Sequence, residues 1–137
     1  MANEDFTKIA VWVKAQELAA DVARIVSQLP SDRSADAIGR QLIRCAGSVP
    51  ANIAECYGRY SQAAYRSHLS IARGSLFESQ SWIDLLHRTG FLSEEAKNSM
   101  IASCQEVGRM LTFRMKSLGG ADSTYAKKGP IQRATVL

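Results

Sequence analysis

Apolar residues recur at intervals of three and four along most of this chain, and this periodicity is what most restricts the fold. Within residues 8–29 they occur at Val11, Ala15, Leu18, Val22, Ile25 and Leu29. This spacing places them on one face of a helix. Pro30 ends the segment, because the residue before a proline disfavours helical geometry. Alternating, strand-like patterns are almost absent, so we expect an all-α protein.

The same periodicity predicts three more helices. The second starts near Ser34 as its N-cap and buries Ile38, Leu42, Cys45, Val49, Ile53 and Cys56. The third runs from about Ser61 to Thr89 and buries Tyr65, Leu69, Ala72, Leu76, Ile83 and Leu86, with Phe77 beside them. The fourth opens at Ser93 and buries Met100, Cys104, Val107, Leu111 and Leu118. Pro50 lies inside the second helix, where its missing N–H predicts a kink.

Short predicted loops favour antiparallel neighbours. We therefore expect an up-down-up-down antiparallel four-helix bundle over residues 1–120, in keeping with a single domain for 137 residues. Residues 121–137 have no periodicity and are expected to form a flexible tail. Trp12, Trp82, Phe77 and Tyr60 fit inside such a bundle, and any of them left in an exposed patch would indicate an oligomer interface.

The net charge of +4 is unevenly distributed. Residues 33–75 hold six arginines against Asp36 and Glu55, whereas residues 76–120 hold equal numbers of basic and acidic residues. Helical spacing places five of these arginines on the polar sides of the second and third helices: Arg40, Arg44, Arg59, Arg66 and Arg73. One interpretation is a surface that follows a phosphate backbone. The other is a solvated face, or a set of salt bridges between subunits.

No motif for catalysis or metal binding is present. The chain has no Gly-rich phosphate loop, no nucleophile elbow, no HExxH and no Glu-x-x-His pair for a di-metal bundle. Cys45, Cys56 and Cys104 lack zinc or disulfide spacing and are expected to be buried thiols. We therefore expect no enzyme activity and no cofactor. The N-terminus is acidic, and no apolar run approaches the roughly 18 residues of a membrane span, so we expect no membrane contact and a cytoplasmic location.

One segment is more specific than the rest: Ser48, Val49, Pro50, Ala51, Asn52, Ile53, Ala54 and Glu55, followed by Gly58 and Arg59. Ser48, Asn52 and Glu55 could satisfy the backbone groups that Pro50 frees, which would make this a structural kink motif. With Val11-Trp12 and Ile71-Ala72-Arg73-Gly74-Ser75-Leu76, the segment resembles the bacterial four-helix bundle family associated with intervening sequences in 23S ribosomal RNA genes. Relatives of that family are accessory proteins of diversity-generating retroelements. The resemblance covers about residues 6–118, and Cys56 and Ala37 depart from glycines common in the family.

The resemblance implies a non-enzymatic protein that forms a homo-oligomeric ring, typically a homopentamer. It also implies that a basic surface meets RNA or DNA, or a reverse transcriptase partner. Two functional hypotheses follow. The chain is a nucleic-acid-binding or ribonucleoprotein accessory module, or it is a structural or protein-adaptor bundle whose arginine stripe forms contacts between subunits.

Overall fold

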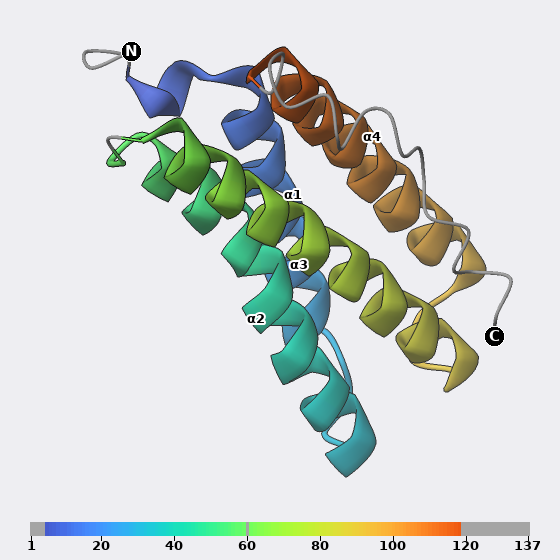
Figure 1. Ribbon diagram of the computed structural model, residues 1–137. Helices are drawn as coiled ribbons and strands as arrows, with labels where there is room; N and C mark the ends of the chain where they lie inside the picture. Colours follow the sequence, from blue (N-terminus) through green and yellow to red (C-terminus); the bar gives the residue numbers. More distant parts are fainter. Residues whose placement is uncertain (1–4, 60, 119–137) are drawn as a thin grey trace, which may run out of the picture.

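The computed structural model describes residues 5–59 and 61–118, which form helices joined by short connections and contain no strand (Figure 1). The elements are a short 3-10 helix η1 (Phe6–Lys8) and four α-helices: α1 (Ala10–Ser27), α2 (Arg33–Cys56), α3 (Gln62–Arg88) and α4 (Glu94–Leu118). The predicted all-α class is thus confirmed. No helix in the described residues is long and apolar enough to cross a membrane. The predicted tail of residues 121–137 lies outside the described residues.

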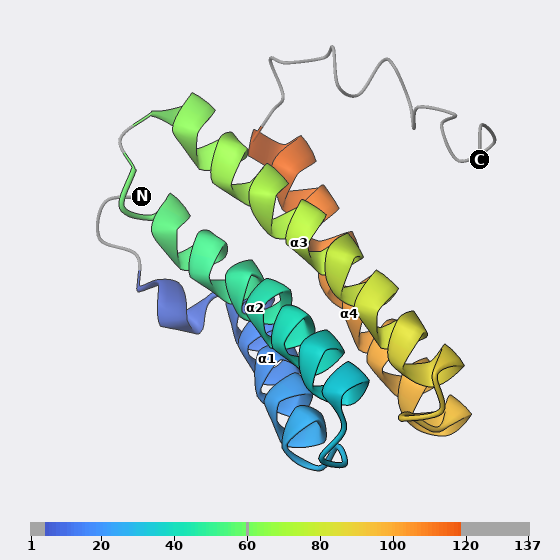
Figure 2. The same cartoon turned by 90° about the horizontal axis from the view of Figure 1, so that it is seen from below.

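The helices pack in chain order. The most extensive contact joins α2 and α3, the α1–α2 and α3–α4 contacts follow, and α1 meets α4 over a smaller area. Figures 1 and 2 show each helix running back along its predecessor after a short connection at one end of the bundle. This arrangement is the predicted up-down-up-down four-helix bundle.

Side chains cap the starts of α2, α3 and α4, whereas α1 begins after Ile9 without a side-chain cap. The carboxylate of Asp32 accepts hydrogen bonds from the Ser34 and Ala35 amides at 2.8 and 3.1 Å, so Asp32, and not the predicted Ser34, is the N-cap of α2. Ser61 caps α3 by accepting from the Ala64 amide at 3.0 Å, and Ser93 accepts from the Ala96 amide at 3.1 Å, as predicted. These caps satisfy amides that have no partner inside the helix.

One apolar core runs through all four helices. The residues predicted to be buried in α2 and α3 are buried, apart from Phe77. In α1 the first four predicted residues are buried, whereas Ile25 and, just after the helix, Leu29 are only partly buried against the core. In α4 the first four are buried, and the side chain of Leu118 lies outside the described part of the chain. The largest completely enclosed side chains include Tyr65, Leu42, Ile53, Leu69, Leu76, Ile83 and Leu86. The helical periodicity of apolar residues therefore located the core correctly.

Phe77 corrects part of that prediction. Its side chain is 51% exposed and lies on the surface of α3 instead of beside the core. Phe77 follows the buried Leu76 by one position, about 100° around the helix, and this rotation carries it outward toward α4. Trp12 and Trp82 are partly buried against the core as expected, whereas Tyr60 lies outside the described residues.

Pro50 is buried inside α2, and the helix continues through it to Cys56. Proline removes one backbone donor and crowds the carbonyl of the residue four positions earlier, which is Ala46 here. Ala46 is itself buried and small, so a bulky side chain does not add to this crowding. The α-helix thus continues through the proline without a break.

Candidate nucleic-acid interface

The predicted arginine stripe is divided between two sides of the bundle. Arg40, Arg44 and Arg59 belong to the α2 side, and each is paired with an acid of its own chain. Arg40 pairs with Asp36 at 2.9 Å, Arg44 bridges to Glu78 on α3, and Arg59 pairs with Glu55. Surface pairs of this kind contribute little to stability, but they offset the positive charge that the sequence analysis assigned to this face.

Arg73 belongs to the other side of α3. Its Nε donates a 3.2 Å hydrogen bond to the Thr112 hydroxyl of α4, and its guanidinium lies 4.9 Å from the centre of the Phe77 ring. Arg66 precedes Arg73 by two helical turns and therefore lies on a similar side of α3. The five arginines thus do not form one continuous surface.

The polar residues of the Pro50 segment form what we call the α2/α3 seam: Ser48, Asn52, Ser75 and His68. Asn52 Nδ2 donates to the Ser48 carbonyl at 2.8 Å and to the Ser48 hydroxyl at 2.9 Å, and the Ser75 hydroxyl lies 3.0 Å from the Ser48 hydroxyl. The Asn52 Oδ1 contacts His68 Nδ1 at 3.1 Å.

The seam explains why Ser48 and Asn52 are polar in a helix that packs closely on α3. Both side chains are partly buried. Their polar atoms are satisfied by the hydrogen bond between them within α2, and that of Ser48 also by the bond to Ser75 of α3. Glu55 lies at its edge, 3.6 Å from His68 Nδ1. The Asn52 side chain bonds to the Ser48 carbonyl and not to the Ala46 carbonyl, which is the group that loses its donor at Pro50, so this bond does not support the kink-capping interpretation.

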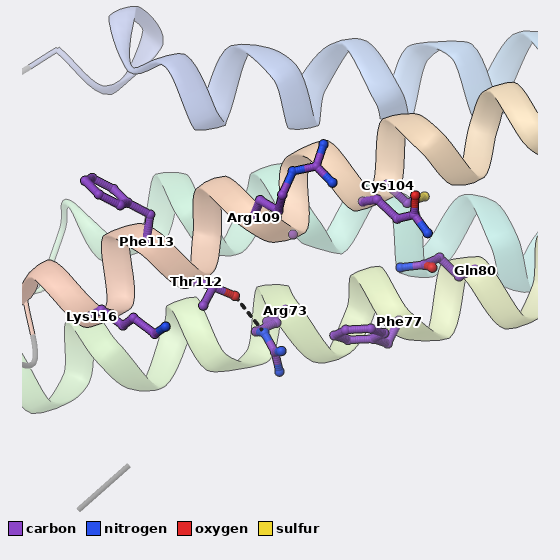
Figure 3. Close-up of a pocket in the computed structure, with 10 residues that line it drawn as sticks. Arg73, Phe77, Gln80, Cys104, Arg109, Thr112, Phe113 and Lys116 are labelled. Atoms are coloured by element: carbon purple, nitrogen blue, oxygen red, sulfur yellow. Dashed lines mark hydrogen bonds between the residues drawn. The ribbon is translucent and has the colours of Figure 1, made fainter. Parts of the chain in front are cut away.

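A groove lies between α3 and α4. Its volume is about 650 Å³. Its walls are formed by Arg73, Phe77, Gln80, Cys104, Gln105, Gly108, Arg109, Thr112, Phe113 and Lys116. Figure 3 shows Arg73 and Phe77 on the α3 side, with Arg109, Thr112, Phe113 and Lys116 on α4. We call this feature the α3/α4 groove.

The α3/α4 groove is cationic and has no acidic side chain in its lining. Within the described residues, neither Arg109 nor Lys116 forms an ion pair, and Arg73 bonds only to neutral groups. Glu106, the nearest acid along α4, instead pairs with Lys14 of α1 at 3.7 Å. Such a concentration of positive charge beside aromatic rings suits an anionic, ring-bearing ligand.

Gly108 lines the α3/α4 groove without a side chain. A Cβ at Gly108 would lie 3.3 Å from the Leu76 Cδ2 atom, which is closer than most such contacts. The absence of a side chain therefore lets α4 approach α3 at this point and leaves the space above it open.

The composition of the chain concealed this site. Arg109, Phe113 and Lys116 stand at i, i+4 and i+7 on α4, and this spacing is the signal that could have revealed their shared face. The equal numbers of basic and acidic residues in 76–120 drew attention away from it. Charge balance along a segment does not report charge balance across its surface.

Arg114 is a second residue that sequence reasoning missed, and its contacts are structural. Its Nε donates to the Tyr65 hydroxyl at 3.2 Å, its Nη2 donates to the Tyr57 hydroxyl, and its guanidinium lies 5.7 Å from the Tyr57 ring centre. Tyr57 and Tyr65 also pack edge to face, with their ring centres 5.4 Å apart. Arg114 thus joins the last turns of α4 to the ends of α2 and α3 that lie beside them.

The three cysteines are buried, free thiols, as predicted. Burial raises the pKa of Cys56 to about 11 and the pKa of Cys104 to about 12, and it also raises the pKa of Cys45. A thiol that stays protonated at neutral pH is a poor nucleophile. Within residues 5–59 and 61–118, no group of three or more His, Cys, Asp or Glu side chains is placed to hold a metal ion.

Two observable properties should follow from these thiols. A disulfide reagent near neutral pH is expected to label them only after denaturant is added. Because the raised pKa favours the neutral thiol in the folded state, its stabilising effect is complete below about pH 9, the ordinary thiol value, and is lost as the pH rises toward 11 or 12. The free energy of unfolding should therefore fall above pH 9, and fall less steeply in Cys56→Ala/Cys104→Ala. Rapid labelling of the native protein would contradict this account.

The fold and the groove together define a class: a small all-helical bundle with a cationic, aromatic-lined groove on one side. The family model described as 23S rRNA-intervening sequence protein matches residues 7–113, and the chain belongs to that family. The structure is also similar to a crystal structure of a protein with unknown function from the S23 ribosomal protein family of Bacteroides thetaiotaomicron. The two share 26% sequence identity and a TM-score of 0.73, over 77% of this chain and 95% of the other. No curated protein matches the chain.

Proposed function

We propose that this protein is a non-enzymatic, homo-oligomeric bundle that binds nucleic acid as an accessory module. The observation that carries the nucleic-acid part is the α3/α4 groove, where Arg73, Arg109 and Lys116 lie together with no acid in the lining. Arginine binds phosphate groups through its planar set of N–H donors. Several copies in one assembly would add their weak phosphate contacts through avidity.

The homo-oligomeric part is supported by a different region, which we call the outer α2/α3 surface: Ile43, Gly47, Ala51, Ile71, Gly74 and Leu85. Its three large apolar side chains are exposed to solvent: Ile43 by 44%, Ile71 by 49% and Leu85 by 37%. The charged pair of Arg44 and Glu78 crosses this surface, so opposite charges are available to a second copy. Apolar residues bordered by both signs of charge suit contact between identical subunits. The family resemblance gives five as the expected subunit number.

A salt series tests the nucleic-acid part of the proposal. Binding of labelled RNA and DNA oligonucleotides is measured by fluorescence anisotropy at increasing salt. The logarithm of the binding constant should fall linearly with the logarithm of the salt concentration, because bound phosphates release counterions. Arg73→Ala/Arg109→Ala/Lys116→Ala is expected to weaken binding by roughly tenfold or more and to lower the slope by about two units.

Arg40→Ala/Arg44→Ala/Arg59→Ala is the matched control, because it removes the same formal charge from arginines that are paired with acids. This control should change binding far less than the groove variant. The reverse result would assign the phosphate contacts to the predicted arginine stripe. Absence of binding at low salt would exclude the nucleic-acid function altogether.

Light scattering after size exclusion tests the homo-oligomeric part. The expected result is a single mass that is a multiple of the 15.0 kDa chain. Loss of assembly in the arginine control would instead favour the second hypothesis from the sequence, an adaptor bundle whose arginines form intersubunit contacts.

A further inference from the structure

Phe113 is unusually placed for a large apolar side chain. It is 77% exposed, more than any other large apolar residue among those the structure describes. It lies on α4 in the lining of the α3/α4 groove, and Figure 3 shows its ring projecting away from the ribbon. An aromatic ring that stands free in water at a cationic groove offers a face on which another ring can stack.

Two cations flank this ring on the same helix. Arg109 precedes Phe113 by one turn, and Lys116 follows it by three residues, so both are its neighbours on the surface of α4. At 1.5 Å per residue, the two cationic residues start about 10 Å apart along the axis, with the ring between them. Figure 3 shows both side chains directed away from the ring, so each turns about its rotatable bonds to reach a phosphate beside the stacked base. A nucleotide has the matching pattern, because its base is flanked by one phosphate on each side.

The opposite wall repeats the combination of a cation and a ring. Arg73 lies over the half-exposed ring of Phe77 at 4.9 Å, and its bond to Thr112 holds the guanidinium across the groove. A guanidinium has five N–H donors, so donors remain for a phosphate after the bond to Thr112. Each wall of the groove of about 650 Å³ therefore has a cation and an aromatic ring.

We propose that the α3/α4 groove binds single-stranded nucleic acid, with one base stacked on Phe113 and its two flanking phosphates bound by Arg109 and Lys116. This inference rests on the proposed function and specifies its ligand. A duplex cannot use the site in this way, because the faces of its bases are already covered by their neighbours in the stack. Stacking tolerates every base, so the groove selects strandedness and not sequence.

The test compares a labelled oligouridylate or oligothymidylate with a blunt duplex of equal length, at one salt concentration. Phe113→Ala is expected to weaken single-strand binding by roughly tenfold or more, which is the usual effect of removing one stacking ring. It should leave duplex binding unchanged. Phe113→Trp should retain single-strand binding, whereas Phe113→Leu, which keeps an apolar side chain without a ring, should lose it.

The outcomes separate this inference from the proposed function. If wild type binds single strands and duplexes alike and Phe113→Ala changes neither, the inference is wrong and the nucleic-acid function stands. If Phe113→Leu binds as well as wild type, apolar contact and not stacking is responsible, and the inference is again wrong. If Phe113→Ala changes the solution mass but not binding, Phe113 is a contact between copies and the inference is wrong. If wild type binds neither ligand, both proposals fail.

Discussion

Gly47→Leu/Gly74→Leu is expected to abolish assembly and to leave each folded bundle at least as stable as before. A Cβ built at either glycine meets nothing within 4 Å, and neither residue has a positive φ. Both lie in helix interiors, where glycine costs about 1 kcal/mol relative to alanine. The single chain therefore gives no reason for glycine at these positions.

The two glycines lie at the same level of the bundle. Each precedes one of the serines that meet in the α2/α3 seam, Ser48 and Ser75, and each is exposed. They interrupt the outer α2/α3 surface with two backbone-level depressions between its exposed apolar residues. A helix from a second copy could approach closely there, which a leucine would prevent.

Light scattering and thermal unfolding provide the two readouts for this prediction. The leucine variant should run at the mass of one chain and should unfold at the same or a higher temperature than an isolated wild-type chain. Ala20→Leu is the matched control, since Ala20 is also a small exposed residue in a helix interior, but on α1. An unchanged mass for the leucine variant would exclude the outer α2/α3 surface as the contact between copies.

Leu76→Ala is expected to lower the free energy of unfolding by about 3–4 kcal/mol. Leu76 is completely buried at the centre of α3 and fills the space that Gly108 leaves on α4. Removing three heavy atoms there loses their burial and leaves a cavity that packed neighbours close only in part. Denaturant titrations at one protein concentration measure the change.

A pair of substitutions tests the stated reason for the Leu76 effect. Gly108→Ala in the wild-type background should destabilise, because its Cβ would crowd the Leu76 Cδ2 atom at 3.3 Å. In the Leu76→Ala background that crowding is absent, and the same substitution should be neutral or stabilising. Phe113→Ala, which removes an exposed side chain, serves as the control and should change stability by less than about 1 kcal/mol. Additive effects of the Leu76 and Gly108 substitutions would contradict the packing described.

The helices and the core were predictable because both depend on local periodicity. Residues such as Leu42, Leu69 and Val107 are buried where the spacing placed them. The residue that caps α2 was harder to predict, because Ser34 and Asp32 are both good capping residues. The extended backbone of Asp32, with φ −139°, identifies it as the N-cap.

The candidate site was less predictable, because it depends on which helix faces become neighbours. Arg73 and Arg44 both occupy polar positions of their helices, yet one turns toward α4 and the other pairs across to Glu78. Arg109 and Phe113 can be recognised as groove residues only when α4 is placed beside α3. Periodicity along one helix gives no information about the rotation of its partner, and so the groove was absent from the sequence-based expectations.

The contacts of Arg114 bear on how firmly the groove presents its ring. The final turns of a helix normally fray, since their carbonyls lack partners inside the helix. Arg114 bonds to two tyrosine hydroxyls on the inner side of the same turn from which Phe113 projects outward. The backbone beneath the ring is thereby immobilised before any ligand arrives, so an incoming strand loses little additional conformational entropy of the protein. Arg114→Met should therefore make the entropy of single-strand binding less favourable, although it removes no side chain that lines the α3/α4 groove.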